Sequence, residues 1–278
     1  QTRLSAIGEL MGATLKPASP TPFNGDMGPH RRFDWLRMEL EDVKAVRRKL
    51  GCTLNDVVLA TVAGAVRRFL QQRQVDPAVI DFRVSAPVSV RREEDRGKMG
   101  NHVSSWIVPL PVDEEDPIER VKAIYTRTQE LKRSRQALGV EMMMGAADFI
   151  GTTLLSLGAR ASSGPINSIV TNVPGPQVPL YMLGARLEAI YPQVPLLHEM
   201  GLGIALMSYD GKLCWGFNGD YEMMPDMKDL VAQVLETFEE LQEAVGMRVV
   251  DSSQDPILQR EAERERLESA DPAPSGGA

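Results

Sequence analysis

Residues 53–73, which read TLNDVVLATVAGAVRRFLQQR, decide the fold class of this chain. Apolar residues cover nearly every face of the helix that this stretch predicts, so the helix must be buried on most sides. The stretches FRVSAPVSV at 82–90 and SSWIVPLPV at 104–112 have the composition of strands, and the prolines in both place parts of them at an edge or a bulge. A buried helix beside strands predicts an α/β fold.

Hydrophobic periodicity predicts the remaining elements. The dipeptide Asp210-Gly211 suits a tight turn with positive φ and predicts a hairpin around it. Further helices are predicted over 41–50, 116–138, 141–161 and 225–245, and further strands over 32–40, 166–173, 186–191, 200–209 and 212–218.

Three segments divide the chain. Residues 1–24 read as the end of a helix followed by a Pro-rich connector, residues 25–250 as the folded α/β unit, and residues 251–278 as a charged and then Pro/Gly-rich tail that is mostly disordered. The chain begins at Gln1 rather than Met, so we expect it to be part of something longer.

Composition excludes several classes of function. A net charge of −7 over 278 residues argues against a nucleic-acid-binding face. Two cysteines cannot build a disulfide framework, and the three histidines lack the spacing of metal ligands, so no metal site is expected. Nucleophile-elbow and P-loop motifs are absent, as is any apolar run of about 18 residues. These features predict a soluble or at most peripheral protein.

The start of the buried helix carries two polar side chains with different interpretations. Thr53 and Asp56 have the spacing of a capping box, which is the favoured interpretation of Asp56. Asn55 is not needed for the cap, so a substrate-facing role and a structural role remain equally open for it.

Three other features have both a structural and a functional interpretation. The run Thr171-Asn172-Val173-Pro174-Gly175-Pro176 ends a strand either as a plain turn or with an amide at the mouth of a cleft. Arg91 and Arg92 are either solvated loop charges, which is the favoured interpretation, or contacts to the phosphates of a nucleotide-bearing cofactor. The Met-rich stretch 141–161 is either core, again favoured, or a wall for a lipid chain or a membrane-facing patch.

Together these segments resemble the C-terminal half of the bacterial wax ester synthase/diacylglycerol acyltransferase family. The resemblance covers roughly residues 25–245 and rests most specifically on NDVVLA and TNVPGP, in this order and at this separation. The other matching segments are MGPHRRFDW, LEDVKAVRRKLGCTLNDVVLATVAGAVRRFL, VSAPVSVR, GNHVSSWIVPLPV followed by DPIERVKAI, and GLGIALMSYDGKLCWGFNGD.

The resemblance implies a two-lobed α/β fold like that of chloramphenicol acetyltransferase and peptide-synthetase condensation domains. The C-terminal lobe of such a fold is expected to be a mixed sheet with flanking helices. The resemblance also implies transfer of a long acyl chain from acyl-CoA, a co-substrate, to a diacylglycerol or fatty alcohol hydroxyl, as in bacterial triacylglycerol and wax ester synthesis. The family's general base is a His in a His-His-x-x-x-Asp-Gly motif. That motif is missing from this chain, which implies a catalytic N-terminal lobe elsewhere and an isolated chain without activity.

This C-terminal lobe is then expected to supply the opposite wall of the tunnel. Asn55 and Asp56 are its substrate-orienting candidates, and its candidates for the cleft or the CoA side are Thr171, Asn172, Pro174, Gly175, Arg91 and Arg92. The implied partners are the N-terminal lobe, acyl-CoA and the lipid acceptor. The implied location is the cytoplasm, with the inner membrane or lipid bodies as peripheral sites.

Two alternatives stay open. One is a non-catalytic scaffold or lipid-surface module of the same fold, which would show no thermal shift with acyl-CoA even beside the first lobe. The other is a condensation-like lobe, which would discharge an acyl-carrier protein rather than acyl-CoA.

Overall fold

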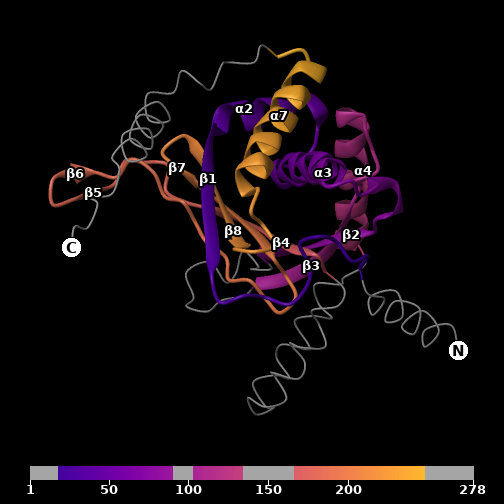
Figure 1. Cartoon of the computed structure of the whole chain (residues 1–278). Coiled ribbons are helices and arrows are strands. Elements are labelled where there is room, and N and C mark those ends of the chain that lie inside the picture. The colour runs from indigo at the N-terminus through magenta and orange to yellow at the C-terminus, as the bar shows by residue number, and fades with distance from the viewer. Residues whose placement is uncertain (1–17, 90–102, 134–165, 248–278) are drawn as a thin grey trace, which may run out of the picture.

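The computed structural model describes residues 18–89, 103–133 and 166–247 (Figure 1). The expected end of a helix near the N-terminus, the Met-rich helix 141–161, Arg91, Arg92 and the tail 251–278 lie outside these ranges. Residues 18–22 of the expected connector form no helix or strand, as their prolines predict.

A six-stranded mixed sheet forms the centre of the fold, which confirms the predicted fold class. Its strand order is β1-β8-β7-β4-β2-β3, and β4 runs parallel to β2 and β7 while all other neighbours are antiparallel. The strands are β1 (Arg31–Glu39), β2 (Phe82–Ser89), β3 (Val103–Leu110), β4 (Ser168–Pro174), β7 (Leu202–Tyr209) and β8 (Lys212–Asp220).

The helices gather on one side of this sheet (Figure 1). They are α2 (Leu40–Leu50), α3 (Leu54–Gln72), α4 (Pro117–Arg133) and α7 (Met227–Ala244), together with the short 3₁₀ helix η1 (Pro77–Val79). Helix α3 lies between α4 and α7 and is buried along nearly its whole length, as its sequence predicts. The inward-facing residues of the strands, such as Ile204 and Trp215, join these helices in one apolar core.

Gly64 allows the helices to approach one another closely. A methyl group at this position would lie less than 3.0 Å from the Arg120 guanidinium of α4 and from the Thr237 methyl of α7. Arg120 is itself buried and donates to the backbone carbonyls of Glu114 and Glu115 at 3.2 and 2.8 Å. Glycine at position 64 therefore sets the distance between three helices.

The other face of the sheet is crossed by residues 187–197, which pair with no strand. The Pro192 carbonyl oxygen lies against Gly216, Val194 lies against Gly203, and the Asn218 amide donates to the Val194 carbonyl at 3.0 Å. The two glycines admit this segment because neither carries a side chain. Gly203 is thus a packing position.

The predicted strand 186–191 is wrong beyond its first residue. Only β6 (Ala185–Arg186) forms there, paired with β5 (Tyr181–Met182) in a separate two-stranded sheet. The residues that follow run across the sheet rather than along its edge, so their backbone groups cannot form a ladder. Extended apolar segments of this kind have the same sequence pattern as strands.

The predicted hairpin turn and the predicted positions of the strand prolines agree with the structure. Asp210 and Gly211 have φ of 42° and 80°, as the predicted hairpin requires. Strand β3 ends the sheet, which is where Pro109 can be tolerated. Strand β2 is an interior strand, but it pairs with β4 only through Val84 and Ser85, so Pro87 lies beyond that ladder.

No single helix in the described ranges is long and apolar enough to cross a membrane. Helices α2 and α3 meet that test only as a pair, which is bent by 99°.

Candidate functional site

The first turn of α3 is held by a complete capping box, which confirms that prediction for Thr53 and Asp56. The Asp56 N–H donates to Thr53 Oγ1 at 3.2 Å, while Asp56 Oδ2 accepts from the Thr53 backbone N–H at 2.9 Å and from its hydroxyl at 2.7 Å. These bonds satisfy donors that every helix start leaves free. They fix the backbone on which Asn55 stands.

Asp56 is only 1% exposed, and its second oxygen, Oδ1, accepts from the Thr128 hydroxyl of α4 at 2.8 Å. Its carboxylate therefore faces the protein interior. Any effect of Asp56 on a bound molecule must act through the position of the helix start.

The structure brings Asn55 and Asn172 together from distant parts of the sequence. Asn172 Nδ2, at the end of β4, donates to Asn55 Oδ1 at 2.8 Å. Asn55 is exposed and Asn172 is half-buried. Both N–H groups of Asn55 Nδ2 have no partner among the described residues, so the pair presents amide donors at the positive end of the α3 dipole.

The turn after β4 is fixed by contacts with the β7–β8 hairpin. The Gly175 N–H donates to Ser208 Oγ at 3.2 Å, and the Gln177 side chain donates to the same oxygen at 3.0 Å. A methyl group on Gly175 would lie closer than 3.0 Å to the Ser208 carbonyl oxygen, which explains the glycine. The turn gives Asn172 a rigid base.

The other predicted site residues do not join the amide pair. Thr171 alternates with Asn172 along β4 and so faces the other side of the sheet, while Pro174 is exposed at the turn. Arg91 and Arg92 lie outside the described residues. Among the candidates that the structure describes, Asn55 and Asn172 are the two whose side chains bond to each other directly.

Sequence reasoning missed Thr128, Ser208 and Gln177. For Thr128 a signal existed, because it occupies the apolar stripe of α4 together with Val121, Ile124 and Leu131. A polar residue on such a stripe needs a buried partner. No comparable signal marks Ser208 or Gln177, whose contacts join the turn after β4 to strand β7.

Neither cysteine is suited to nucleophilic chemistry. Burial, reinforced by the nearby Asp56 carboxylate, raises the pKa of the Cys52 thiol to about 11, and burial also raises the pKa of Cys214. A nucleophilic cysteine needs the opposite shift. His30 and His198 are exposed, and the described ranges contain no cluster of three or more residues able to hold a metal.

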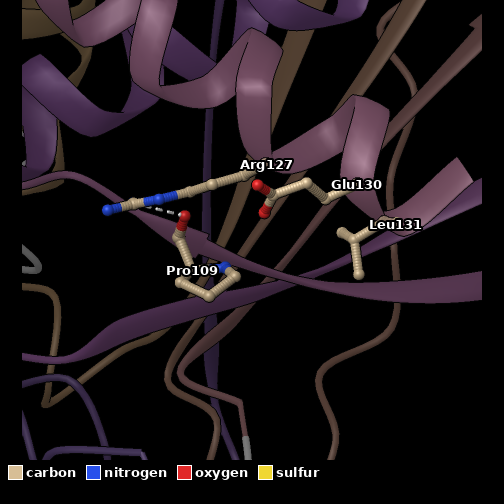
Figure 2. A pocket seen from close by; sticks show the side chains of 4 residues that line it. All are labelled: Pro109, Arg127, Glu130 and Leu131. Carbon is tan, nitrogen blue, oxygen red and sulfur yellow. Dashed lines mark hydrogen bonds between the residues drawn. The ribbon is translucent and has the colours of Figure 1, made fainter. Parts of the chain in front are cut away.

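A small groove of about 230 Å³ lies at the β3 edge of the sheet (Figure 2). It is lined by Pro109, Arg127, Glu130 and Leu131, and the Arg127 guanidinium donates to the Pro109 carbonyl at 2.9 Å. This contact satisfies a carbonyl at the open edge of the sheet. None of the predicted site residues lines the groove.

Two family models match this chain. The WS/DGAT C-terminal domain matches residues 99–242, and the wax ester synthase/diacylglycerol acyltransferase catalytic domain matches residues 2–58. The chain therefore belongs to the wax ester synthase/diacylglycerol acyltransferase family, a family of acyltransferases. The first match contains Asn172 and the second contains Asn55, so the amide pair joins the two matched segments.

The most similar relatives and solved structures agree with this assignment. A protein of Mycobacterium tuberculosis H37Rv, provisionally named as a diacylglycerol O-acyltransferase, is 34% identical over 85% of this chain and 48% of its own length. The wax ester synthase/diacylglycerol acyltransferase of Marinobacter aquaeolei VT8 has a TM-score of 0.65 and 26% identity, over 87% of this chain and 57% of that one.

A condensation domain from the enacyloxin polyketide synthase has the same fold. It matches with a TM-score of 0.52 and 13% identity, over 84% of this chain and 46% of that one. This confirms the condensation-domain-like fold class and nothing further. The chain spans about half the length of the curated relatives that it matches.

Proposed function

We propose that this chain is the C-terminal part of an O-acyltransferase that moves a long-chain acyl group from acyl-CoA to the hydroxyl of a diacylglycerol or a fatty alcohol. The observation that carries the proposal is the Asn55–Asn172 pair at a helix start, in which both N–H groups of Asn55 Nδ2 have no partner among the residues that the structure describes. Membership of the family supports the reaction class.

In the proposed reaction the acceptor oxygen attacks the thioester carbonyl carbon. A general base takes the hydroxyl proton, the carbonyl oxygen becomes negative, and the C–S bond then breaks as the CoA thiol leaves with a proton. Asn55 Nδ2 is proposed to donate to that oxygen. Preorganised donors of this kind stabilise the charge that develops in the transition state.

The base is proposed to be a His of a His-His-x-x-x-Asp-Gly motif in the N-terminal half of the enzyme. None of the three histidines of this chain stands beside another or precedes Asp-Gly at the required offset. The amide pair can orient and polarise a carbonyl but cannot accept a proton at neutral pH. The complete reaction therefore requires the other half.

An exposed apolar hairpin supports the proposal that a partner docks on this chain. Tyr181, Met182 and Leu183 of the β5–β6 hairpin are 64%, 76% and 104% exposed, and the hairpin projects away from the main sheet (Figure 1). The base of the hairpin is fixed, because the Tyr209 hydroxyl accepts from the Leu180 N–H and donates to the Leu187 carbonyl at 2.7 and 3.0 Å. Apolar patches of this kind usually mark an interaction site. We propose that the N-terminal half of the enzyme binds this hairpin.

Acyl-CoA is proposed as the co-substrate, without a metal or a permanently bound cofactor. Arg91 and Arg92 follow β2, which ends at the same edge of the sheet as β4 because the two strands run parallel. Guanidinium groups suit the phosphates of CoA. The proposed location is cytoplasmic, at the surface of the inner membrane or of lipid bodies.

The experiment is the steady-state kinetics of two Asn55 variants of the complete enzyme. Both Asn55→Ala and Asn55→Asp remove the free N–H donors, and the aspartate keeps the shape and the oxygen that accepts from Asn172. We expect each to lower kcat by about 10²-fold, the usual effect of one oxyanion donor. Full activity of the Asn55→Asp variant would contradict the proposed role.

A further inference from the structure

Thr128 is a polar residue on the apolar stripe of α4, and it is 5% exposed. Its hydroxyl lies 2.8 Å from Asp56 Oδ1 and 3.0 Å from the carbonyl of Tyr125, one turn earlier. A hydroxyl donates one proton, and the ionised carboxylate is the stronger acceptor. The contact joins α4 to the first turn of α3, and the two helices lie side by side (Figure 1).

The Asp56 carboxylate depends on few donors. Oδ2 accepts from two groups of Thr53, and Oδ1 accepts from Thr128. No basic nitrogen forms an ion pair with Asp56 within the described ranges. A buried carboxylate that loses one of so few hydrogen bonds is destabilised and must seek another partner. Removing the Thr128 hydroxyl would therefore act directly on the helix start.

Asn55 immediately precedes Asp56 and shares this turn. A shift of the Asp56 carboxylate toward another donor would rotate or fray the turn and change the distance between Asn55 and Asn172, which is now 2.8 Å. Positioned donors lose their effect when they move by about 1 Å. The Asn55 amide is thus held from two sides, by Asn172 directly and by Thr128 through Asp56.

We infer that Thr128 is a positioning residue for the acyl transfer, which it serves by holding Asp56 and so fixing the Asn55 amide. The inference rests on the function proposed above for Asn55. The inference gives α4 a role in the site, although neither residue of the amide pair lies on α4.

The test compares three α4 variants of the complete enzyme. Thr128→Val keeps the shape and removes the donor, and Thr128→Ser keeps the donor. Thr126→Val is the matched control, since the Thr126 hydroxyl is exposed and donates to the Lys122 carbonyl of its own helix, at 3.0 Å. We expect Thr128→Val to lower kcat by about tenfold with KM changed less than about twofold, and both other variants to keep kcat. Wild-type kcat in Thr128→Val would overturn the inference.

A double variant separates positioning from general stability. If Thr128 acts through Asn55, Thr128→Val lowers kcat in the wild-type background but not further in the Asn55→Ala background. Equal losses in both backgrounds would overturn the inference. Loss of activity in Asn55→Ala alone, with none in Thr128→Val, would reject the inference and leave the proposed function standing. No effect of Asn55→Ala would reject the proposed function itself.

Amide hydrogen exchange on this chain gives a readout independent of activity. We expect faster exchange at the backbone N–H of Asp56 in Thr128→Val than in wild type, and wild-type exchange in Thr128→Ser and Thr126→Val. If Thr128→Val does not fold, Thr128→Cys replaces it, because the thiol keeps the size and is only a weak donor. Unchanged exchange in the folded variant would contradict the proposed link.

Discussion

At the scale of the residue, the site is a set of short polar links around the start of α3. Thr53 and Asp56 satisfy the helix start, Thr128 satisfies the second carboxylate oxygen, and Asn172 holds the Asn55 amide. The local part of this set could be predicted, because a capping box depends only on residues three positions apart. The contacts with Thr128 and Asn172 join residues far apart in the sequence and depend on the tertiary fold.

Cys52, which precedes this helix start, predicts a pH dependence of stability. Burial and the Asp56 carboxylate raise the pKa of its thiol from 9.0 in the unfolded chain to about 11 in the folded protein. The unfolded state then loses the proton first, so this contribution to stability is full below pH 9 and is lost as the pH rises toward 11. We expect the free energy of unfolding of Cys52→Ser to fall less steeply over this window than that of wild type.

Denaturant titrations of both proteins across that window measure the difference. Below about pH 8 the two curves should stay parallel, because the thiol is neutral in both states. Parallel curves up to pH 11 as well would contradict the assigned shift.

At the scale of the element, the long periodic segments were predicted best. Helix α3 and the β7–β8 hairpin follow from an apolar pattern and a turn dipeptide, which act locally. The segment 187–197 was not predicted, because an extended chain crossing a sheet has the same alternation as a strand within it. The two kinds of segment differ in the groups with which their backbone N–H and C=O groups pair. That pairing depends on the tertiary fold.

The packing of α3 against α4 and α7 predicts the effect of a single methyl group. In Gly64→Ala the new Cβ meets both the Thr237 methyl and the buried Arg120 guanidinium, and moving Arg120 breaks its bonds to the carbonyls of Glu114 and Glu115. We expect a loss of about 1–3 kcal/mol in the free energy of unfolding, although alanine is the better helix former. Urea denaturation measures it.

Gln71→Ala is the matched control, since Gln71 lies on the exposed surface of the same helix. We expect this variant to stay within about 0.5 kcal/mol of wild type. A Gly64→Ala variant as stable as the control would show that the helices can separate at no cost.

At the scale of the whole molecule, the chain spans about half the length of its curated relatives and has the fold of the family. The family resemblance and the fold class were accessible from sequence, because NDVVLA and TNVPGP are long enough to be specific. The pairing of the two asparagines was not, since it arises only when α3 meets the end of β4. The His-His-x-x-x-Asp-Gly motif, which holds the proposed base, does not occur in the 278 residues of this chain.

The most direct measurement is the rate of acyl transfer from a long-chain acyl-CoA to diacylglycerol. It compares this chain alone, its N-terminal partner half alone, and the two together. We expect no turnover from either half and restored turnover from the mixture, because the base is proposed to lie on the N-terminal half and the amide pair lies on this one. Robust turnover by this chain alone would contradict the account, and so would an inactive mixture of two folded halves that bind each other.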